Sequence, residues 1–397
     1  MSSNAMRILI VTHQVTKNDG QGRVNYEIAR AALAAGHAVT LLASRAAPEL
    51  VNHPRARFVK IGESRLPTRL IQYQVFAWRS GAWIRAHRKA FDVIHVNGFI
   101  AWARADVNAV HFVHDGWYRC GFYPFRFFHG PYHAYQVVYT RLNAWCEKWA
   151  FRHADVVVPV SEKVGAEVRS LGIDTARLQV IYNGVDIDEF APGASQRERF
   201  GLPQAPFMLL FAGDLRVSRK NLDTVLRALA ATPAHVHLVV AGILRNSPYP
   251  ALVASLGLEE RVHFTDLVKD MPALMRSVDA FVFPSRYEPM GLVLLEALAA
   301  ALPVVTVRTA GGAEVIAPDC GIVLEHPDDG VALAAAIMRL ADDRAHARQM
   351  GLAARELART LSWQAMANRY LSLYERLAAR RAVSAMATPS ATVSVES

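Results

Sequence analysis

Residues 279–316 read as a strand, a polar loop, a helix and a second strand in close succession. Residues 280–283 are all apolar, which is typical of a short buried strand. A helix is predicted from Gly291 to about Ala301, because a proline follows before the apolar residues 304–307. Two strands joined through a helix run parallel, since a tight turn joins only antiparallel neighbours. The segment therefore predicts an α/β chain with a parallel sheet.

Two carboxylates lie eight positions apart in this unit, Glu288 in the loop and Glu296 in the helix. The free N–H groups at the helix start, near Gly291 and Leu292, would face a phosphate, and the helix dipole favours an anion there. Glu296 could reach hydroxyl groups at one end of such a ligand and Glu288 those at the other. Carboxylates on both sides of a phosphate site describe a sugar nucleotide. The spacing also fits two charges that face solvent, as helical glutamates usually do.

The sequence around these glutamates is long and distinctive. They lie within PSRYEPMGLVLLEALAAALPVV, with seven residues between them, and AGGAEVI follows. This pattern resembles the retaining glycosyltransferases of family 4, which have the GT-B fold. The resemblance implies that Glu288 contacts a donor sugar and that Glu296 holds the nucleotide ribose. The chain departs from the family pattern at Met290, where an aromatic is common, and at Ala301, where glycine is common.

The resemblance also implies an α/β fold of the GT-B type, in which two Rossmann-like, doubly wound domains face each other across a cleft. We expect an N-terminal acceptor-binding domain over residues 6–186 and a C-terminal nucleotide-sugar donor-binding domain over residues 187–362. A helix over residues 363–381 would cross back to the N-terminal domain, and residues 382–397 are expected to be disordered. A chain of 397 residues, 52% of them hydrophobic, can fill two such cores.

Charge and cysteine content limit which partners and which cell compartment are expected. Residues 7–152 carry 20 Lys and Arg against 8 Asp and Glu, a net of +12, and the rest carries 24 against 27, or −3, giving the total of +9. A nucleic acid, an anionic membrane surface or an anionic acceptor would suit the basic half, although an arginine-rich composition explains it equally well. No nucleic-acid-binding module is recognisable, so no nucleic acid partner is expected. Three scattered cysteines and no apolar run of membrane-spanning length predict a cytoplasmic protein.

Residues 116–152 alternate aromatic, glycine, proline and arginine residues before a helix expected from about Tyr132. Aromatic side chains beside basic ones suit the headgroup level of a membrane or a stacking site for an acceptor. Packing within a lid over the cleft would explain the same aromatics. Peripheral contact with the inner face of the membrane is therefore one of three interpretations.

The chain begins with a Rossmann-like pattern. Residues 7–11 form an apolar strand, a polar loop with Gly20 and Gly22 follows, and a helix is expected from about Val24. The dinucleotide motif G-x-G-x-x-G is incomplete, because Asn25 stands at its third glycine, so NAD is not expected. The resemblance implies that Gly20 and Gly22 face the donor phosphates and the acceptor.

A histidine is expected at the rim of the cleft. His114 follows an apolar strand expected over residues 109–113, and open α/β sheets bind ligands at the carboxyl ends of their strands. The resemblance implies that a histidine at such a position contacts the donor sugar, which makes His114 the candidate. His95 and His111 are the alternatives, and a single histidine can also be structural.

The second domain opens with an apolar strand at residues 207–211, then Gly213 and a basic loop with Arg216, Arg219 and Lys220. Three cations near a helix start would neutralise a diphosphate, although such a loop could simply be solvated. The resemblance implies that Lys220 and Arg219 hold the donor diphosphate, with Arg216 behind them.

Two further segments complete the site. The resemblance implies that Leu267 and Val268 border the nucleobase through their backbone groups. Asp186 and Asp188 form a D-x-D, which binds a metal in other glycosyltransferases. Their surroundings match the connection between GT-B domains, so we interpret them as structural and expect no metal and no cofactor.

The resemblance, together with these features, implies a metal-independent retaining glycosyltransferase. It would move a sugar from a nucleotide diphosphate-sugar donor to a sugar or glycolipid acceptor, in the synthesis of cell-surface polysaccharide, lipopolysaccharide or glycolipid. A non-hydrolysing sugar-nucleotide epimerase and a non-catalytic sugar-nucleotide-binding protein are the alternatives. The residues expected to act on the reacting groups are His114, Glu288, Lys220 and Arg219. Those expected to bind the nucleotide sugar are Gly20, Gly22, Gly213, Arg216, Leu267, Val268, Gly291, Leu292 and Glu296.

Overall fold

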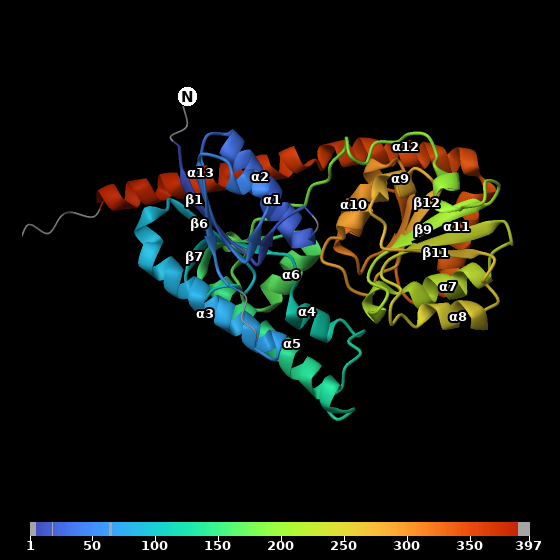
Figure 1. Cartoon of the computed structure of the whole chain (residues 1–397), viewed down its shortest axis with the longest axis horizontal. Helices are drawn as coiled ribbons and strands as arrows, with labels where there is room; N and C mark the ends of the chain where they lie inside the picture. Colours follow the sequence, from blue (N-terminus) through green and yellow to red (C-terminus); the bar gives the residue numbers. More distant parts are fainter. Residues whose placement is uncertain (1–4, 18, 63–65, 388–397) are drawn as a thin grey trace, which may run out of the picture.

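The computed structural model describes residues 5–17, 19–62 and 66–387. It contains two six-stranded parallel sheets, each of which forms the centre of one domain. Figure 1 shows the two domains side by side, with the C-terminal helices α12 (Arg344–Thr360) and α13 (Trp363–Ala387) running along one edge of both. This arrangement confirms the predicted fold class.

The N-terminal sheet has the strand order β5-β3-β1-β6-β7-β8, and its strands pair in parallel throughout. The strands are β1 (Arg7–Val11), β3 (Ala38–Ala43), β5 (Ala56–Lys60), β6 (Val93–Asn97), β7 (Ala105–Val110) and β8 (Ala154–Pro159). The helices are α1 (Gly20–Ala34), α2 (Pro48–Val51), α3 (Arg69–His87), α4 (His114–Arg119), α5 (Pro131–Arg152) and α6 (Glu162–Ser170). A small separate pair joins β2 (Gln14–Val15) to β4 (Arg45–Ala46).

The C-terminal sheet has the order β11-β10-β9-β12-β13-β14, again all parallel. The strands are β9 (Phe207–Ala212), β10 (Val236–Ala241), β11 (Val262–Asp266), β12 (Ala280–Phe283), β13 (Val304–Val307) and β14 (Gly321–Leu324). The helices, besides α12, are α7 (Leu222–Ala230), α8 (Tyr249–Ser255), α9 (Met271–Met275), α10 (Leu292–Ala299) and α11 (Gly330–Asp342). Every residue of β9 and β12 is buried, as expected for central strands covered on both faces.

The two sheets share one topology. Numbered along the chain within each domain, both have the strand order 3-2-1-4-5-6. The order reverses between β1 and β6 in one domain and between β9 and β12 in the other. Ligands of open α/β sheets bind at such points, outside the carboxyl ends of the strands. The topology therefore predicts a ligand site at the loops after β1, β9 and β12.

The chain crosses between the domains twice, and the two crossings lie against each other. The Val185 amide donates to Leu361 O at 2.9 Å, and the Trp363 amide donates to Val185 O at 3.2 Å. A β-carbon on Gly184 would lie 2.6 Å from backbone atoms of Trp363, so only glycine allows this close approach. We propose that the domain boundaries lie at these crossings.

Helix α13 packs against the N-terminal domain. Its buried side chains Tyr370, Leu373 and Tyr374 belong to the same core as Ile8 of β1 and Ile28 of α1. The helix continues to Ala387, so the expected disordered tail from residue 382 is wrong for residues 382–387, and residues 388–397 lie outside the described part. Within the described ranges, no helix is long and apolar enough to cross a membrane.

Two expected element boundaries are also wrong. Helix α1 begins at Gly20 rather than near Val24, so both glycines of the expected loop lie in its first turn. Strand β7 ends at Val110, whereas the expected strand ran to residue 113. Both shifts change which side chains reach the site.

Candidate active site

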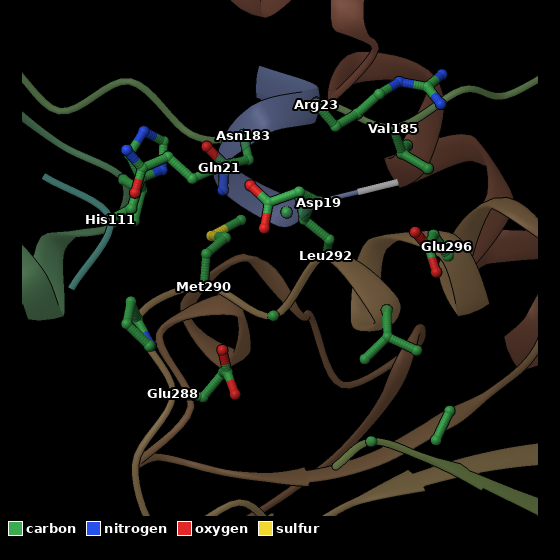
Figure 2. A pocket seen from close by; sticks show the side chains of 18 of the residues that line it. Asp19, Gln21, Arg23, His111, Asn183, Val185, Glu288, Met290, Leu292 and Glu296 are labelled. Atoms are coloured by element: carbon green, nitrogen blue, oxygen red, sulfur yellow. The ribbon is translucent and has the colours of Figure 1, made fainter. Parts of the chain in front are cut away.

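A cavity of about 800 Å³ lies between the two domains. Its lining comes from segments that follow β1, β7, β9 and β12, close to both points where the strand order reverses. Figure 2 shows Asp19 and Gln21 reaching in from the α1 side, with Glu288 and Glu296 on the side of the C-terminal domain.

Helix α10 presents an uncapped N-terminus to this cavity. Gly291 precedes it with a φ of 84°, and no side chain accepts a hydrogen bond from its first turn. A β-carbon on Gly291 would lie 3.2 Å from Cγ of Glu288, so both conformation and space favour glycine. The first N–H groups of a helix lack partners within the helix and carry its positive partial charge. The arrangement therefore suits an anion, above all a phosphate.

Two cations lie beside that helix end, on the loop after β9. Lys220 Nζ contacts the Glu288 carboxylate, and a guanidinium nitrogen of Arg219 lies 3.6 Å from Glu288 Oε2. Arg219 also donates to the backbone oxygen of Tyr287 at 3.0 Å. The next residue, Asn221, has a φ of 66°, and its buried amide donates to two backbone oxygens at 2.9 and 2.7 Å. The loop is thus fixed with both cations against the cavity.

Glu288 is almost fully buried, with 9% of its surface exposed. Burial by itself would raise the pKa of its carboxyl, but the charges of Lys220 and Arg219 outweigh burial and hold the pKa below its ordinary value. The peptide is fixed as well, since the Gly311 amide donates to Glu288 O at 2.8 Å. Glu288 therefore offers an ionised acceptor, in a fixed place, to a hydroxyl of a bound ligand.

Glu296 differs from Glu288 in its electrostatic surroundings. Burial raises the pKa of Glu296 to about 7, and the Glu189 carboxylate adds to the rise while Arg23 opposes it. No cation contacts Glu296 directly within the described part of the chain. Near neutral pH the carboxyl is thus partly protonated and can both donate to and accept from hydroxyl groups.

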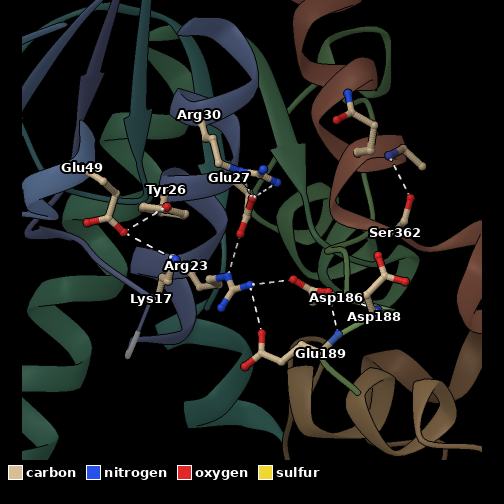
Figure 3. Close-up of polar contacts among 12 residues, drawn as sticks. Lys17, Arg23, Tyr26, Glu27, Arg30, Glu49, Asp186, Asp188, Glu189 and Ser362 are labelled. Carbon is tan, nitrogen blue, oxygen red and sulfur yellow. Dashed lines mark hydrogen bonds and ion pairs between the residues drawn. The ribbon is translucent and has the colours of Figure 1, made fainter. Parts of the chain in front are cut away.

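Arg23 of α1 connects three segments at one end of the cavity. It donates to Glu27 at 2.8 Å and lies 3.4 Å from both Asp186 and Glu189 of the connection between the domains. Its guanidinium also lies over the Trp363 ring, 5.6 Å from the ring centroid. Figure 3 shows Arg23 with Glu27, Asp186 and Glu189, so that one N-terminal arginine holds the interdomain connection.

The D-x-D aspartates have structural partners. Asp186 Oδ1 accepts from the backbone amides of Asp188 and Glu189, at 3.2 and 3.0 Å, and the other oxygen of Asp186 faces Arg23. Among the residues that the structure describes, no group of three or more His, Cys, Asp or Glu side chains is placed to hold a metal ion.

The structure brings His111, not His114, into the cavity. His111 directly follows β7, its Nε2 lies 3.2 Å from Asn97 Oδ1, and burial lowers its pKa to about 4, so the ring is neutral. His114 instead begins α4 and pairs through Nδ1 with Glu147 at 2.7 Å. The expected position of His114 differs because the strand ends three residues earlier than its apolar pattern suggested.

The other predicted residues divide into two groups. Glu288, Glu296, Lys220, Arg219, Gly20, Gly213, Gly291 and Leu292 all line the cavity. Gly22, Arg216, Leu267 and Val268 do not. The Gly22 amide donates to Asp19 at 2.7 Å, Arg216 pairs with the neighbouring Asp214 at 2.9 Å, and Leu267 is 72% exposed.

Several lining residues were not predicted from the sequence, among them Asp19, Gln21, Arg23, Asn183 and Trp363. An aspartate just before a helix is a recognisable N-cap signal, so Asp19 could have been found. The positions of Asn183 and Trp363 depend on where the two crossings meet, which leaves no local signal in the sequence.

Comparisons with known proteins match both halves of the chain. The family model described as Glycosyltransferase Family 4 matches residues 18–189, and the model described as Glycosyl transferases group 1 matches residues 206–343. The D-inositol 3-phosphate glycosyltransferase of Xylanimonas cellulosilytica is 28% identical over 353 residues, which cover 83% of this chain and 82% of that protein.

Two solved structures share the fold. Sucrose-phosphate synthase from Thermosynechococcus elongatus has a TM-score of 0.78 at 23% identity, covering 94% of this chain and all of that one. Anabaena HepE, in complex with UDP and glucose, has a TM-score of 0.68 at 19% identity, covering 96% of this chain and all of that one. Since both domain models match in order and the interdomain cavity contains the two glutamates of the family pattern, the chain belongs to the family 4 glycosyltransferases of the GT-B fold.

Proposed function

We propose that this chain moves a sugar from a nucleotide diphosphate-sugar donor to an acceptor hydroxyl with retention of configuration, through the residues of the interdomain cavity. The observation that carries this proposal is the uncapped N-terminus of α10 beside Lys220, Arg219 and Glu288. One anion site thus adjoins a buried carboxylate that can orient a sugar. The epimerase alternative has no support among the relatives named above.

The donor diphosphate is proposed to bind at the start of α10, with Lys220 and Arg219 as its counter-ions. In the structure Lys220 contacts Glu288, so part of the positive charge of the site is neutralised before a donor arrives. The ribose would lie against Glu296, deeper along α10, and the transferred sugar against Glu288. His111 replaces His114 as the proposed contact with the sugar, because only His111 lines the cavity.

The chemical step follows from these roles. The bond between the anomeric carbon and the diphosphate oxygen breaks, and the acceptor oxygen bonds to the same carbon on the same face. The acceptor proton passes to a diphosphate oxygen, so atoms and charge balance without an enzymic nucleophile. Lys220, Arg219 and the end of α10 stabilise the charge that develops on the departing diphosphate. Glu288 and the neutral His111 hold the sugar in place.

We propose that the acceptor is anionic or linked to a lipid, as in cell-surface glycoconjugate synthesis. The net charge of +12 over residues 7–152 supports an anionic acceptor. The Xylanimonas relative is named for an inositol phosphate acceptor, which also carries negative charge.

Calorimetric titration with ADP, GDP, UDP and NAD, each with and without EDTA, tests the donor site. One nucleoside diphosphate should bind, and Glu288→Gln should leave its affinity unchanged while the rate of sugar transfer falls. Binding of NAD alone, or binding abolished by EDTA, would contradict the proposal. Full transfer activity in Glu288→Gln would remove that residue from its sugar-orienting role.

A further inference from the structure

Helices α3 and α5 lie side by side on the N-terminal domain. Gln74 of α3 donates to Cys146 Sγ of α5 at 3.4 Å, and the rings of Tyr73 and Tyr139 are 6.4 Å apart. Each helix leads into a strand of the same parallel sheet, so the two run in the same direction. Figure 1 shows them along the lower edge of the domain, with the start of α5 projecting beyond its body.

Both helices expose large apolar side chains at helical spacing. On α3, Ile71 and Trp78 are 43% and 64% exposed, and on α5, Val138 and Trp145 are 45% and 59% exposed. Both pairs are seven residues apart, which places each pair on one face of its helix. Phe128, just before α5, is 93% exposed. Exposure of so many large apolar groups in one region of a molecule marks an interaction surface.

The charges of this region have one sign. In residues 66–91 and 116–152, all described by the structure, Glu147 is the only carboxylate, and it is buried against His114. The basic side chains there are Arg69, Arg79, Arg85, Arg88, Lys89, Arg119, Arg126, Arg141, Lys148 and Arg152. Two of them are paired with carboxylates outside these ranges, Arg88 with Asp106 and Arg119 with Asp115. Lys89, Arg141 and Lys148 have no side-chain hydrogen bond or ion pair within the described residues, so their charges are available to a partner.

We propose that these exposed side chains of α3 and α5, with residues 126–128, form a basic aromatic face that docks on an anionic phospholipid bilayer. Indole rings prefer the boundary between headgroups and acyl chains, and basic residues are attracted to anionic lipid. An acidic protein surface would also match the positive charge, but exposed indole and phenyl rings among basic side chains fit a bilayer, which combines an anionic plane with an apolar layer. A nucleic acid or a soluble polyanion offers no apolar layer for Trp78, Trp145 and Phe128.

The position of this face fits the proposed function. The docking on lipid does not depend on that function; only the link between the face and the acceptor does. Residues 111 and 112 line the cavity, and α4 begins two residues later and packs against α5. Docking through α3 and α5 would therefore keep the acceptor-binding side of the cleft close to the lipid surface, where a lipid-linked acceptor resides.

Flotation of the full chain with vesicles tests the docking surface. Vesicles of phosphatidylcholine alone are compared with vesicles that also contain phosphatidylglycerol, and binding is expected only to the latter. The triple variant Lys89→Gln, Arg141→Gln, Lys148→Gln should bind on the order of a hundredfold more weakly, since each basic residue contributes about fivefold near an anionic surface. The matched control, Arg227→Gln, Arg339→Gln, Arg348→Gln, removes the same charge from exposed positions of the C-terminal domain and should bind normally.

The double variant Trp78→Ser, Trp145→Ser tests insertion. It should lose most vesicle binding and most of the blue shift of tryptophan fluorescence, whereas Val331→Ser, Leu352→Ser, at exposed C-terminal positions, should change neither. Equal binding to both vesicle types, an equal loss in the charge control, or normal binding of the tryptophan variant would overturn the proposal. So would a loss of dimers in the tryptophan variant without lipid, because the face would then be a contact between copies. Unchanged melting temperature and nucleotide affinity show that a variant is folded, and they also separate failure here from failure of the donor site.

Discussion

The two domains have the same strand order but use their helix N-termini at the cleft in opposite ways. Helix α1 of the N-terminal domain is capped by Asp19, whose carboxylate accepts from the Gly22 amide at 2.7 Å. Helix α10 of the C-terminal domain has no side-chain cap, and Lys220 and Arg219 lie nearby. A carboxylate at the first helix end satisfies its amides and repels a phosphate, whereas the second end leaves them for one. Topology thus supplies two candidate anion sites, and side chains select one.

The largest expected effect comes from removing a cation on the C-terminal side of the cleft. Lys220→Met should lower the rate of sugar transfer by about 10²–10³-fold, because it removes a cation aimed at the departing diphosphate. It also leaves Glu288 buried beside Arg219 alone, so nucleoside diphosphate affinity should fall too. Steady-state kinetics and calorimetry measure both effects.

Arg216→Gln is the matched control, since Arg216 pairs with Asp214 outside the cavity lining. Its transfer rate should stay close to that of the unmodified chain. Equal losses in the two variants would mean that general positive charge, not the position of Lys220, serves the reaction.

The second effect compares the two glycines at the starts of α1 and α10, both of which line the cavity. Gly291→Ala should weaken nucleotide binding about tenfold, because an L-residue at a φ of 84° costs roughly 1–2 kcal/mol and Glu288 Cγ is 3.2 Å from the new β-carbon. Gly20→Ala should change binding little, since its β-carbon would meet only Leu292 Cδ1 at an ordinary 3.7 Å. Calorimetry with the preferred nucleoside diphosphate gives the ratio. A larger loss in Gly20→Ala would reverse the assignment of the phosphate site.

The third effect concerns the pH dependence of stability. The pKa of Glu296 is raised from 4.5 to about 7, so the folded chain holds its proton more tightly than the unfolded chain does. This group therefore stabilises the fold below pH 4.5, and its contribution is lost as pH rises towards 7. In the unmodified chain this group should lower the free energy of unfolding by about 1–3 kcal/mol between these pH values, and Glu296→Gln should abolish that decrease, as measured by urea unfolding.

Glu288 provides the opposite case. Its pKa is lowered, so its contribution is present above the ordinary value and lost as pH falls through the lowered one. For Glu296, a free energy of unfolding that still falls by the full amount between pH 4.5 and 7 in Glu296→Gln would show that another group causes the loss of stability.

The smallest effect tests the cap on α1. Asp19→Ala should lower the free energy of unfolding by about 0.5–2 kcal/mol, and Asp19→Asn by less, because asparagine also caps helices. Thermal unfolding compares the two variants. A nucleotide affinity raised in both would show that the Asp19 charge, not the cap, keeps phosphate away from α1, whereas unchanged stability in Asp19→Ala would show that the cap is unimportant.

Much of the fold was predictable from local patterns. The apolar strands at residues 280–283 and 304–307 appear with the predicted bounds, because burial on both faces of a sheet leaves a continuous apolar run. The two boundary errors have a similar cause. The polar residues of the loop continue into the first turn of α1, which begins at Gly20, and the apolar pattern of β7 continues past its end at Val110.

The sequence by itself determined the fold class and the glutamates of the C-terminal half of the cavity, because a loop and the helix it enters are covalently adjacent. Which histidine lines the cavity depends on the tertiary structure. Strand β7 ends at Val110, so His111 follows it directly and lines the cavity, whereas His114 does not. The tertiary structure also decided that Arg23 meets Asp186 and Glu189, residues more than 160 positions away. The pKa difference between Glu288 and Glu296 is of the same kind. Identical side chains diverge because only folding places two cations beside one and a second carboxylate near the other.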